Sequence, residues 1–258
     1  MSKKSLRPAA KFAASFLDAH ARDAGARSLL APDQLPCTIA ARTRRVYDHL
    51  ASVYPVSSFC FHSRAHVRAL DHSGVRNGMR VLEIATGSGE MFRRLIRANP
   101  SGKTFGLDLS PNMAARTQSR ARSEFPLAHS HCGAVDVRNL PFRNASFDAI
   151  VCCYLFELLS RDDIRLTLQE IRRVLRVGGT FSLVVIGENA PVFNRLYRFA
   201  GRLAPAFWGR QVERAAPGLL EESGLRIVAT QSVRQMGYPS RVLVARSYNP
   251  YDPREART

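Results

Sequence analysis

Short hydrophobic runs alternate with stretches of helical periodicity between residues 79 and 185. The runs have the length of strands, and the stretches between them repeat their apolar residues at helical spacing. This order predicts βαβ units and a parallel sheet that is covered by helices on both faces. Two later runs, residues 226–234 and 240–246, flank a turn at residues 237–239 and predict a β-hairpin.

Amphipathic and loop-like segments lie outside this alternating region. On a helical wheel, residues 6–22 place apolar side chains on one side and mostly basic ones on the other. Two helical stretches, 44–54 and 62–70, are separated by Pro55 and two serines, and the long connection after the last parallel strand carries a second basic amphipathic stretch. The expected organisation is a basic N-terminal helix and linker (1–41), a lid-like helical segment (42–78), a main α/β domain (79–247, with a cap insertion at 187–217) and a loose tail (248–258).

A glycine-rich turn joins the first predicted strand to a helix over residues 81–90. This arrangement aims backbone N–H groups and a helix dipole at a ligand, which can be a dinucleotide or S-adenosylmethionine. The dinucleotide pattern needs a third small residue, but the two possible registers place Phe92 or Glu90 there. Glu83, two residues before the turn, suits a cationic amino-acid ligand better than a pyrophosphate. The turn therefore favours a methyl-donor site.

A second acid follows the next hydrophobic run, where Asp108 lies nineteen residues beyond Gly89. In a parallel sheet the end of the second strand lies beside the loop of the first. A carboxylate there can accept hydrogen bonds from two ribose hydroxyls. This spacing supports an adenosine-containing ligand.

Further motifs follow in order: Asp136 after a third run, an NLPF segment before the run at 146–153, and a glycine turn at 178–179 before the strand at 181–186. The series, over roughly residues 47–246, resembles the class I S-adenosylmethionine-dependent methyltransferases. It is most similar to their type 11 group, which includes ubiquinone/menaquinone and phospholipid methyltransferases. The resemblance implies a Rossmann-like, doubly wound, mostly parallel seven-stranded sheet with an antiparallel C-terminal edge hairpin, and makes residues 79–247 the methyltransferase domain. Ala85 departs from the family, which usually has its first glycine there.

The resemblance also implies a cofactor site for S-adenosyl-L-methionine. Glu83 would bind the methionine amino group and Asp108 the ribose hydroxyls. Asp136 and the Val137 amide would contact the adenine. The full expected set is Glu83, Ala85, Gly87, Gly89, Asp108, Leu109, Asp136, Val137 and Cys153. Because the methyl donor is already activated, in-line transfer needs little covalent help, and the sequence identifies no catalytic base.

Residues on the acceptor side are expected in two places. Residues 47–55 resemble the YDxxAxxYD lid element of quinone methyltransferases, with Pro55 in place of the last Asp, so Tyr47 or Tyr54 would close over the cofactor. The alternative is an amphipathic helix whose aromatics pack on the core. Phe156, after the fourth strand, indicates an apolar acceptor pocket. His62 and His66 are one helical turn apart, but no spacing fixes a carboxylate or thiolate partner, and we expect no metal.

The formal charge of +17 over 258 residues calls for an anionic partner. Residues 6–22 and 192–208 are candidates for docking on an anionic membrane surface, or else they cover the core. The expected acceptor is therefore lipid-associated, a phospholipid headgroup amine or a quinone-type ring; the alternatives are a small soluble metabolite, or RNA binding and methylation on the same fold. No nucleic-acid module is recognisable. With no secretory signal and no apolar run of spanning length, we expect a cytoplasmic protein, peripheral on the inner face of a membrane if the basic helices bind lipid.

Overall fold

The computed structural model describes residues 54–188 and 210–248. Several predicted features lie outside this part of the chain, namely Tyr47, the basic segments 6–22 and 192–208, and nearly all of the tail. Of residues 54–61, including Tyr54, the backbone alone is described. Within the described residues, no helix combines the length and apolar character that crossing a bilayer requires.

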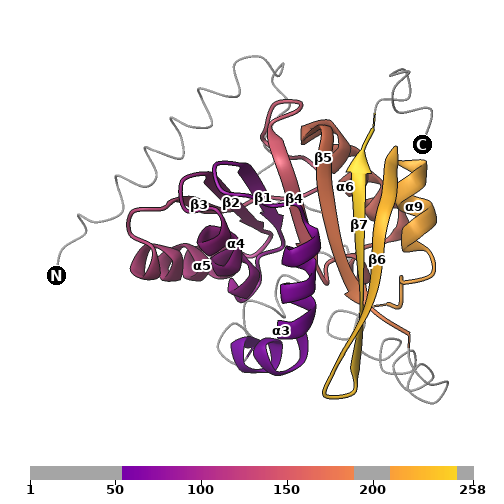
Figure 1. The fold of residues 1–258 in the computed structure, drawn as a ribbon, viewed down its shortest axis with the longest axis horizontal. Helices are drawn as coiled ribbons and strands as arrows, with labels where there is room; N and C mark the ends of the chain where they lie inside the picture. Colours follow the sequence, from indigo (N-terminus) through magenta and orange to yellow (C-terminus); the bar gives the residue numbers. More distant parts are fainter. Residues whose placement is uncertain (1–53, 189–209, 249–258) are drawn as a thin grey trace.

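Seven strands form one twisted sheet in the order β3-β2-β1-β4-β5-β7-β6 (Figure 1). β7 is antiparallel to both of its neighbours, whereas the other strand pairs are parallel. The predicted fold is confirmed, including the antiparallel hairpin at the C-terminal edge. The strands are β1 (Arg80–Ile84), β2 (Lys103–Asp108), β3 (His129–Ala134), β4 (Phe147–Cys153), β5 (Leu175–Ile186), β6 (Leu225–Gln235) and β7 (Tyr238–Ser247).

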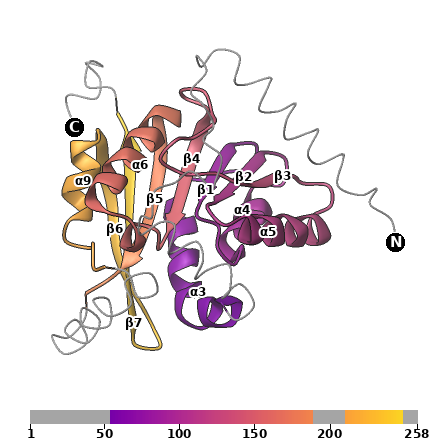
Figure 2. The ribbon, with the colours of Figure 1, turned by 180° about the vertical axis from the view of Figure 1, so that it is seen from behind.

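Helices cover both faces of the sheet, as Figures 1 and 2 show from opposite sides. α3 (Tyr54–His72), α4 (Glu90–Ala98) and α5 (Pro111–Glu124) lie on one face. α6 (Arg161–Val174) and α9 (Ala216–Glu222) cover the other, and a 3-10 turn (Phe156–Leu158) follows β4. The buried side chains divide accordingly, since one apolar cluster lies under α6 and α9 and two others lie under α3, α4 and α5.

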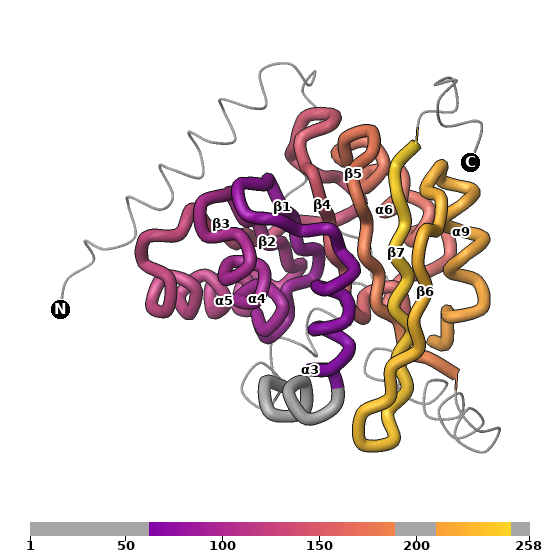
Figure 3. The backbone as a smooth tube through the Cα atoms, in the orientation of Figure 1, coloured from indigo at the N-terminus to yellow at the C-terminus, as the bar shows by residue number. Residues whose placement is uncertain are grey.

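The prediction that residues 55–61 form a non-helical stretch between two helices is wrong, because α3 runs without interruption from Tyr54 to His72. Nearly all of the other predicted helical stretch, 44–54, lies outside the described residues. Pro55 lies in the first turn of this helix. A proline is tolerated there because the first turn has no intrahelical acceptor for its missing N–H. α3 packs along β5, β6 and β7, and the Arg64 amide donates to the Gln235 side chain 2.7 Å away. The turn of the β6–β7 hairpin extends beyond the ends of the other strands, beside α3 (Figure 3).

A glycine on β2 makes room for a large ring on α4. Phe92 is fully buried, and a Cβ placed on Gly106 would lie 2.9 Å from its ring and 2.7 Å from the Thr86 methyl group. The dinucleotide pattern requires a small residue at position 92, where this chain has a phenylalanine. The ring fits because the neighbouring strand supplies the small residue, Gly106.

Replacing Gly106 with alanine should therefore lower the free energy of unfolding by about 1–3 kcal/mol, since overpacking forces rings and backbone to move. Urea unfolding measures this. Gly218→Ala on α9 is the control, because nothing lies within 4 Å of a Cβ at that position. Its stability should stay equal or rise slightly. Equal behaviour of the two variants would contradict this account of the packing.

Candidate cofactor and acceptor site

The candidate site lies where the carboxyl ends of β1, β2 and β4 meet. The chain order reverses between β1 and β4, and open α/β sheets bind ligands at such a switch point. Residues 85–89 connect β1 to α4. The Thr86 amide donates to the Leu107 carbonyl at 3.0 Å, and the Gly87 amide donates to Asp108 Oδ2 at 2.8 Å. The end of β2 therefore holds the loop that follows β1.

The loop has three residues in the left-handed region of the backbone. Gly87 has a φ of 49° and Gly89 a φ of 78°, which glycine adopts without cost. Ala85 has a φ of 59°, in the region that an L-residue occupies at a cost of roughly 1–2 kcal/mol. Ala85, which replaces the usual family glycine, therefore has a strained backbone conformation. Strain of this kind persists where the surrounding structure enforces it, often at ligand sites.

Helix α5 binds the outer side of the same loop. Thr117 Oγ1 donates to the Gly87 carbonyl at 3.3 Å, and Arg120 donates to the Ser88 carbonyl at 3.2 Å. A Cβ on Gly89 would lie 2.8 Å from Thr117 Oγ1, so glycine is required for this close approach. Two carbonyl groups of the loop are thereby satisfied by α5.

Glu83 is buried in the middle of this arrangement. It is 2% exposed, and its Oε2 has no hydrogen-bond partner among the described residues. Burial raises the pKa of Glu83 well above its ordinary value, and the nearby carboxylates of Asp108 and Glu90 raise it further. A buried carboxylate without a compensating cation is costly, so the pocket is built to accept positive charge.

Asp108 lies at the end of β2 and orders the backbone around it. Besides Gly87, it accepts a hydrogen bond from the Ser110 amide, 2.9 Å from Oδ1. These hydrogen bonds fix the Asp108 carboxylate at the end of β2, and a carboxylate oxygen can accept more than one hydrogen bond. This is compatible with the expected contact to a ribose.

A small pocket brings together several of the predicted residues with others that sequence reasoning did not assign. Glu83, Ala85, Gly87 and Cys153 were predicted and line it. Asp108 joins them through its hydrogen bond to Gly87. The remaining lining residues are Thr86, Ser88, Glu90, Met91, His62, His66 and Tyr154. The unassigned residues come mainly from α3 and α4, whose packing over the strand ends cannot be read from local sequence.

Tyr154 is held in place by three elements. Its φ is 57°, directly after β4, and its ring stacks on His62 of α3 with a centroid distance of 4.2 Å. Its hydroxyl is hydrogen-bonded to Ser240 Oγ of β7 at 2.7 Å. Tyr238 of the hairpin lies 5.1 Å from the same imidazole. A strained backbone with so many fixed contacts places this ring firmly at the wall of the pocket.

The three residues expected at the adenine, Leu109, Asp136 and Val137, lie outside the pocket around Glu83. Both carboxylate oxygens of Asp136 accept hydrogen bonds from Arg138, which also binds Asp163 at 2.7 Å. The hydrogen bonds that Arg138 donates to Asp136 raise the pKa of Arg138 above its ordinary value. Val137 is buried and Leu109 half-buried, and neither lines the pocket around Glu83.

Phe156, expected to face the acceptor, is fully buried in the apolar cluster under α6 and α9. The 3-10 turn after β4 directs this side chain into the core. The ring therefore packs the fold and does not line the pocket around Glu83. As for metal ions, no three His, Cys, Asp or Glu side chains gather to hold one anywhere in residues 54–188 and 210–248.

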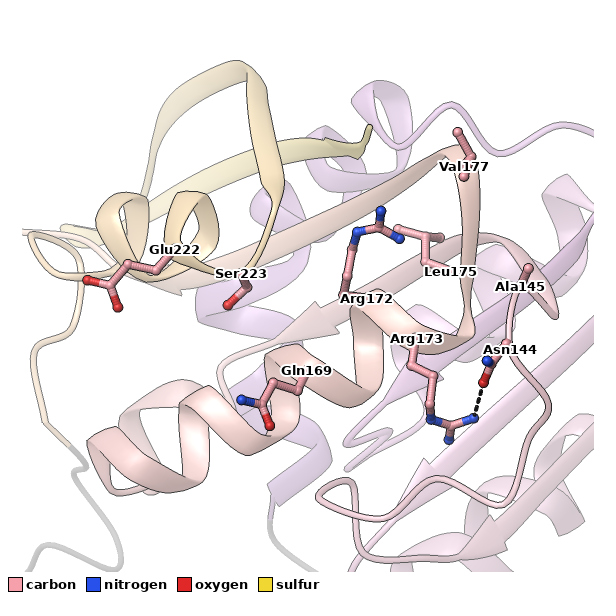
Figure 4. A pocket seen from close by; sticks show the side chains of 9 residues that line it. All are labelled: Asn144, Ala145, Gln169, Arg172, Arg173, Leu175, Val177, Glu222 and Ser223. Atoms are coloured by element: carbon pink, nitrogen blue, oxygen red, sulfur yellow. Dashed lines mark hydrogen bonds between the residues drawn. The ribbon is translucent and has the colours of Figure 1, made fainter. Parts of the chain in front are cut away.

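A larger hollow of about 550 Å³ lies beside the end of α6, between the loop at residues 144–145, the start of β5 and the end of α9 (Figure 4). Arg173 in its wall donates to Glu170 at 2.7 Å and to Asn144 at 3.1 Å. The smaller pocket is lined by Glu83 and His66, each of which has a buried polar atom without a partner among the described residues, and we assign the candidate site there.

The comparisons with known proteins agree with this geometry. Residues 81–179, from β1 to the start of β5, match the model of a methyltransferase domain family. This segment is similar to the methyltransferase domains that the model describes. The described residues share the Rossmann-like fold of a solved methyltransferase.

Relatives and solved structures extend the match. A 2-phytyl-1,4-naphtoquinone methyltransferase of Trichormus variabilis is 31% identical over 138 residues, which is 52% of this chain and 59% of that protein. A demethylmenaquinone methyltransferase of Staphylococcus aureus is 28% identical over 66% of this chain and 70% of its own. The methyltransferase of Haloferax volcanii that was solved with the Trm112 activator superposes with a TM-score of 0.69 at 20% identity, over 81% of this chain and 99% of that one.

Glu157, in the 3-10 turn, is a second buried acid near the end of β5. Its Oε1 accepts from the Ile186 amide at 2.5 Å, and its Oε2 has no partner within the described parts of the chain. Burial raises the pKa of Glu157 to about 7. The folded protein therefore holds this proton to higher pH than the unfolded chain does, where the pKa is near 4.5.

Stability should fall as the pH rises from about 4.5 through about 7, because folding then has to bury a charge. In Glu157→Gln this fall should be smaller by about 2–3 kcal/mol. Urea unfolding of both proteins at pH 4.5 and pH 8 measures it. An unfolding free-energy difference between the two proteins that is the same at both pH values would contradict the prediction.

Proposed function

We propose that this protein transfers the methyl group of S-adenosylmethionine to a quinone-type ring carried by a lipid. One observation supports a quinone-type ring as the acceptor. Two relatives that match this chain are named as methyltransferases of a naphthoquinone and of demethylmenaquinone. The match spans 59% of the length of the first of them. The acceptor therefore stands as a proposal for this chain.

The residues at the switch point fit the cofactor. Glu83 offers a buried, unpartnered carboxylate oxygen to the positively charged amino group, and Asp108 offers acceptors to the ribose hydroxyls. Gly87 and Gly89 allow the backbone to approach the ligand closely. Ala85 and Cys153 line the same pocket. We keep Leu109, Asp136 and Val137 as proposed adenine contacts.

The chemistry asks for positioning more than for covalent help. When bound, the cofactor supplies a methyl group on a positively charged sulfur. The protein then has to hold the acceptor in line with that group and to exclude water. Tyr154, fixed by His62 and Ser240, is the rigid aromatic surface beside the carboxyl end of β4 where this positioning would occur.

A lipid-carried acceptor also agrees with the charge of the chain. A formal charge of +17 attracts an anionic bilayer, and basic side chains near such a surface contribute roughly 1 kcal/mol each. We propose residues 6–22 and 192–208 as the segments that dock there, both outside the described residues. Docking would bring the protein to the membrane in which the acceptor resides.

Transfer of a labelled methyl group tests the proposal. The protein is given labelled S-adenosylmethionine with a naphthohydroquinone bearing an isoprenoid tail, in vesicles rich in anionic lipid. Label should appear in the ring, and Glu83→Ala should reduce the rate at least roughly 10-fold by removing a charge-assisted hydrogen bond to the cofactor. Glu124→Gln, at a surface pair with Arg93 and Arg97, should leave the rate unchanged.

Parallel reactions supply phosphatidylethanolamine vesicles or RNA as the acceptor. Label in either of these with none in the quinol would overturn the proposed acceptor and identify the alternative. No label in any acceptor, with no binding of the cofactor, would remove the proposed activity altogether.

A further inference from the structure

Three polar residues from three elements line the pocket. They are Glu83 on β1, Glu90 at the first position of α4, and His66 on α3. Of the three, only Glu83 was expected from the sequence to bind the cofactor. The glycine-rich loop lines the same space.

Two of these groups have a buried polar atom without a partner. Glu83 Oε2 and His66 Nδ1 make no hydrogen bond with the described residues, and their residues are 2% and 5% exposed. Native structures rarely leave such atoms unpaired unless a ligand or a function accounts for them. Two of them lining one pocket point to a missing hydrogen-bond donor.

The three groups do not satisfy one another. His66 Nδ1 lies 3.7 Å from Glu90 Oε2, which is too far for a hydrogen bond. Glu90 Oε1 accepts from Arg94 at 2.9 Å, and the same Arg94 nitrogen donates to Ser63 at 3.1 Å. Arg94 thus balances one carboxylate, while Glu83 keeps no cation beside it among the described residues.

His66 is an acceptor in this setting and not a cation. Burial, together with the positive charge of Arg94, lowers the pKa of His66 to about 4. A neutral imidazole carries a proton on one nitrogen and accepts at the other, so with Nε2 protonated Nδ1 is free to accept. The pocket therefore presents one carboxylate oxygen, a second carboxylate and one imidazole nitrogen, all of them acceptors.

A primary ammonium group matches this set, since it has three N–H donors, a positive charge and no acceptor. We propose that Glu83, Glu90 and His66 together bind the primary ammonium at the amino-acid end of the cofactor, each accepting one N–H. The inference rests on the proposed cofactor and adds Glu90 and His66 to its binding residues.

Calorimetry with two ligands tests this assignment. S-adenosylhomocysteine carries the ammonium, whereas 5′-methylthioadenosine has the same nucleoside and a thioether but no amino-acid end. Glu90→Gln and His66→Phe should each weaken S-adenosylhomocysteine roughly 10- to 100-fold, the loss expected for a hydrogen bond to a charged group. Both should leave the affinity for 5′-methylthioadenosine unchanged.

Control variants change the same residue types outside the pocket. Glu124→Gln removes a surface acid that pairs with Arg93, and His72→Gln changes an exposed histidine on the same helix as His66. Neither should alter the affinity for either ligand. Equal weakening of both ligands by Glu90→Gln or His66→Phe would overturn the inference and assign these residues a structural role.

A ligand-side measurement avoids dependence on the folding of the variants. N-acetylated S-adenosylhomocysteine lacks the charge and two of the three donors, and it should bind the natural protein at least roughly 10-fold more weakly than the parent compound. Equal affinities would overturn the ammonium assignment while leaving the cofactor site in place. Failure of the natural protein to bind any of these nucleosides would instead overturn the proposed function.

Discussion

A buried carboxylate without a cation beside it is the constraint around which this fold is arranged. Glu83 lies on β1 with 2% exposure, and the described residues give it no positive partner. Parallel pairing sets Glu83 opposite Gly106 on β2 and Val151 on β4, at the point where the chain order reverses. The cost of burying this charge is met when a cationic ligand occupies the pocket.

Other unfavourable features of the backbone gather at the same edge. Ala85 and Tyr154 both have positive φ values and both line the pocket. Phe92 packs where β2 has no side chain, and α5 approaches a loop that tolerates no Cβ at Gly89. The hydrophobic clusters on the two faces of the sheet hold these positions, so two strained residues lie where a ligand would bind.

Much of the fold could be predicted from the sequence because it follows local periodicity. The alternating runs predict the strands, and acids directly after or within such runs identify Glu83 and Asp108. The hairpin around Gly237 follows from two runs and a turn. The non-helical stretch predicted after Pro55 is wrong. In the sequence, a proline in the first turn of a helix cannot be distinguished from a proline in a linker between two helices.

Other parts of the site depend on tertiary packing and could not be predicted. His66 and Glu90 meet because α3 lies across the sheet beside α4, which no local pattern reveals. Phe156 is an apolar residue directly after β4, where an acceptor pocket is expected, but its side chain is buried in the core. The positive φ of Ala85 follows from the geometry of the loop. The one indication in the sequence is that the similar family usually has glycine at this position. The basic segments 6–22 and 192–208 remain predictions.

Proton release on cofactor binding tests the central claim most directly. Burial raises the pKa of Glu83, so a bound ammonium will favour the charged carboxylate and expel the proton. Calorimetric titrations with S-adenosylhomocysteine, in buffers of different ionisation enthalpy at one pH, report the protons exchanged. The account predicts net release that disappears in Glu83→Gln. Tight binding with the same enthalpy in every buffer would contradict it.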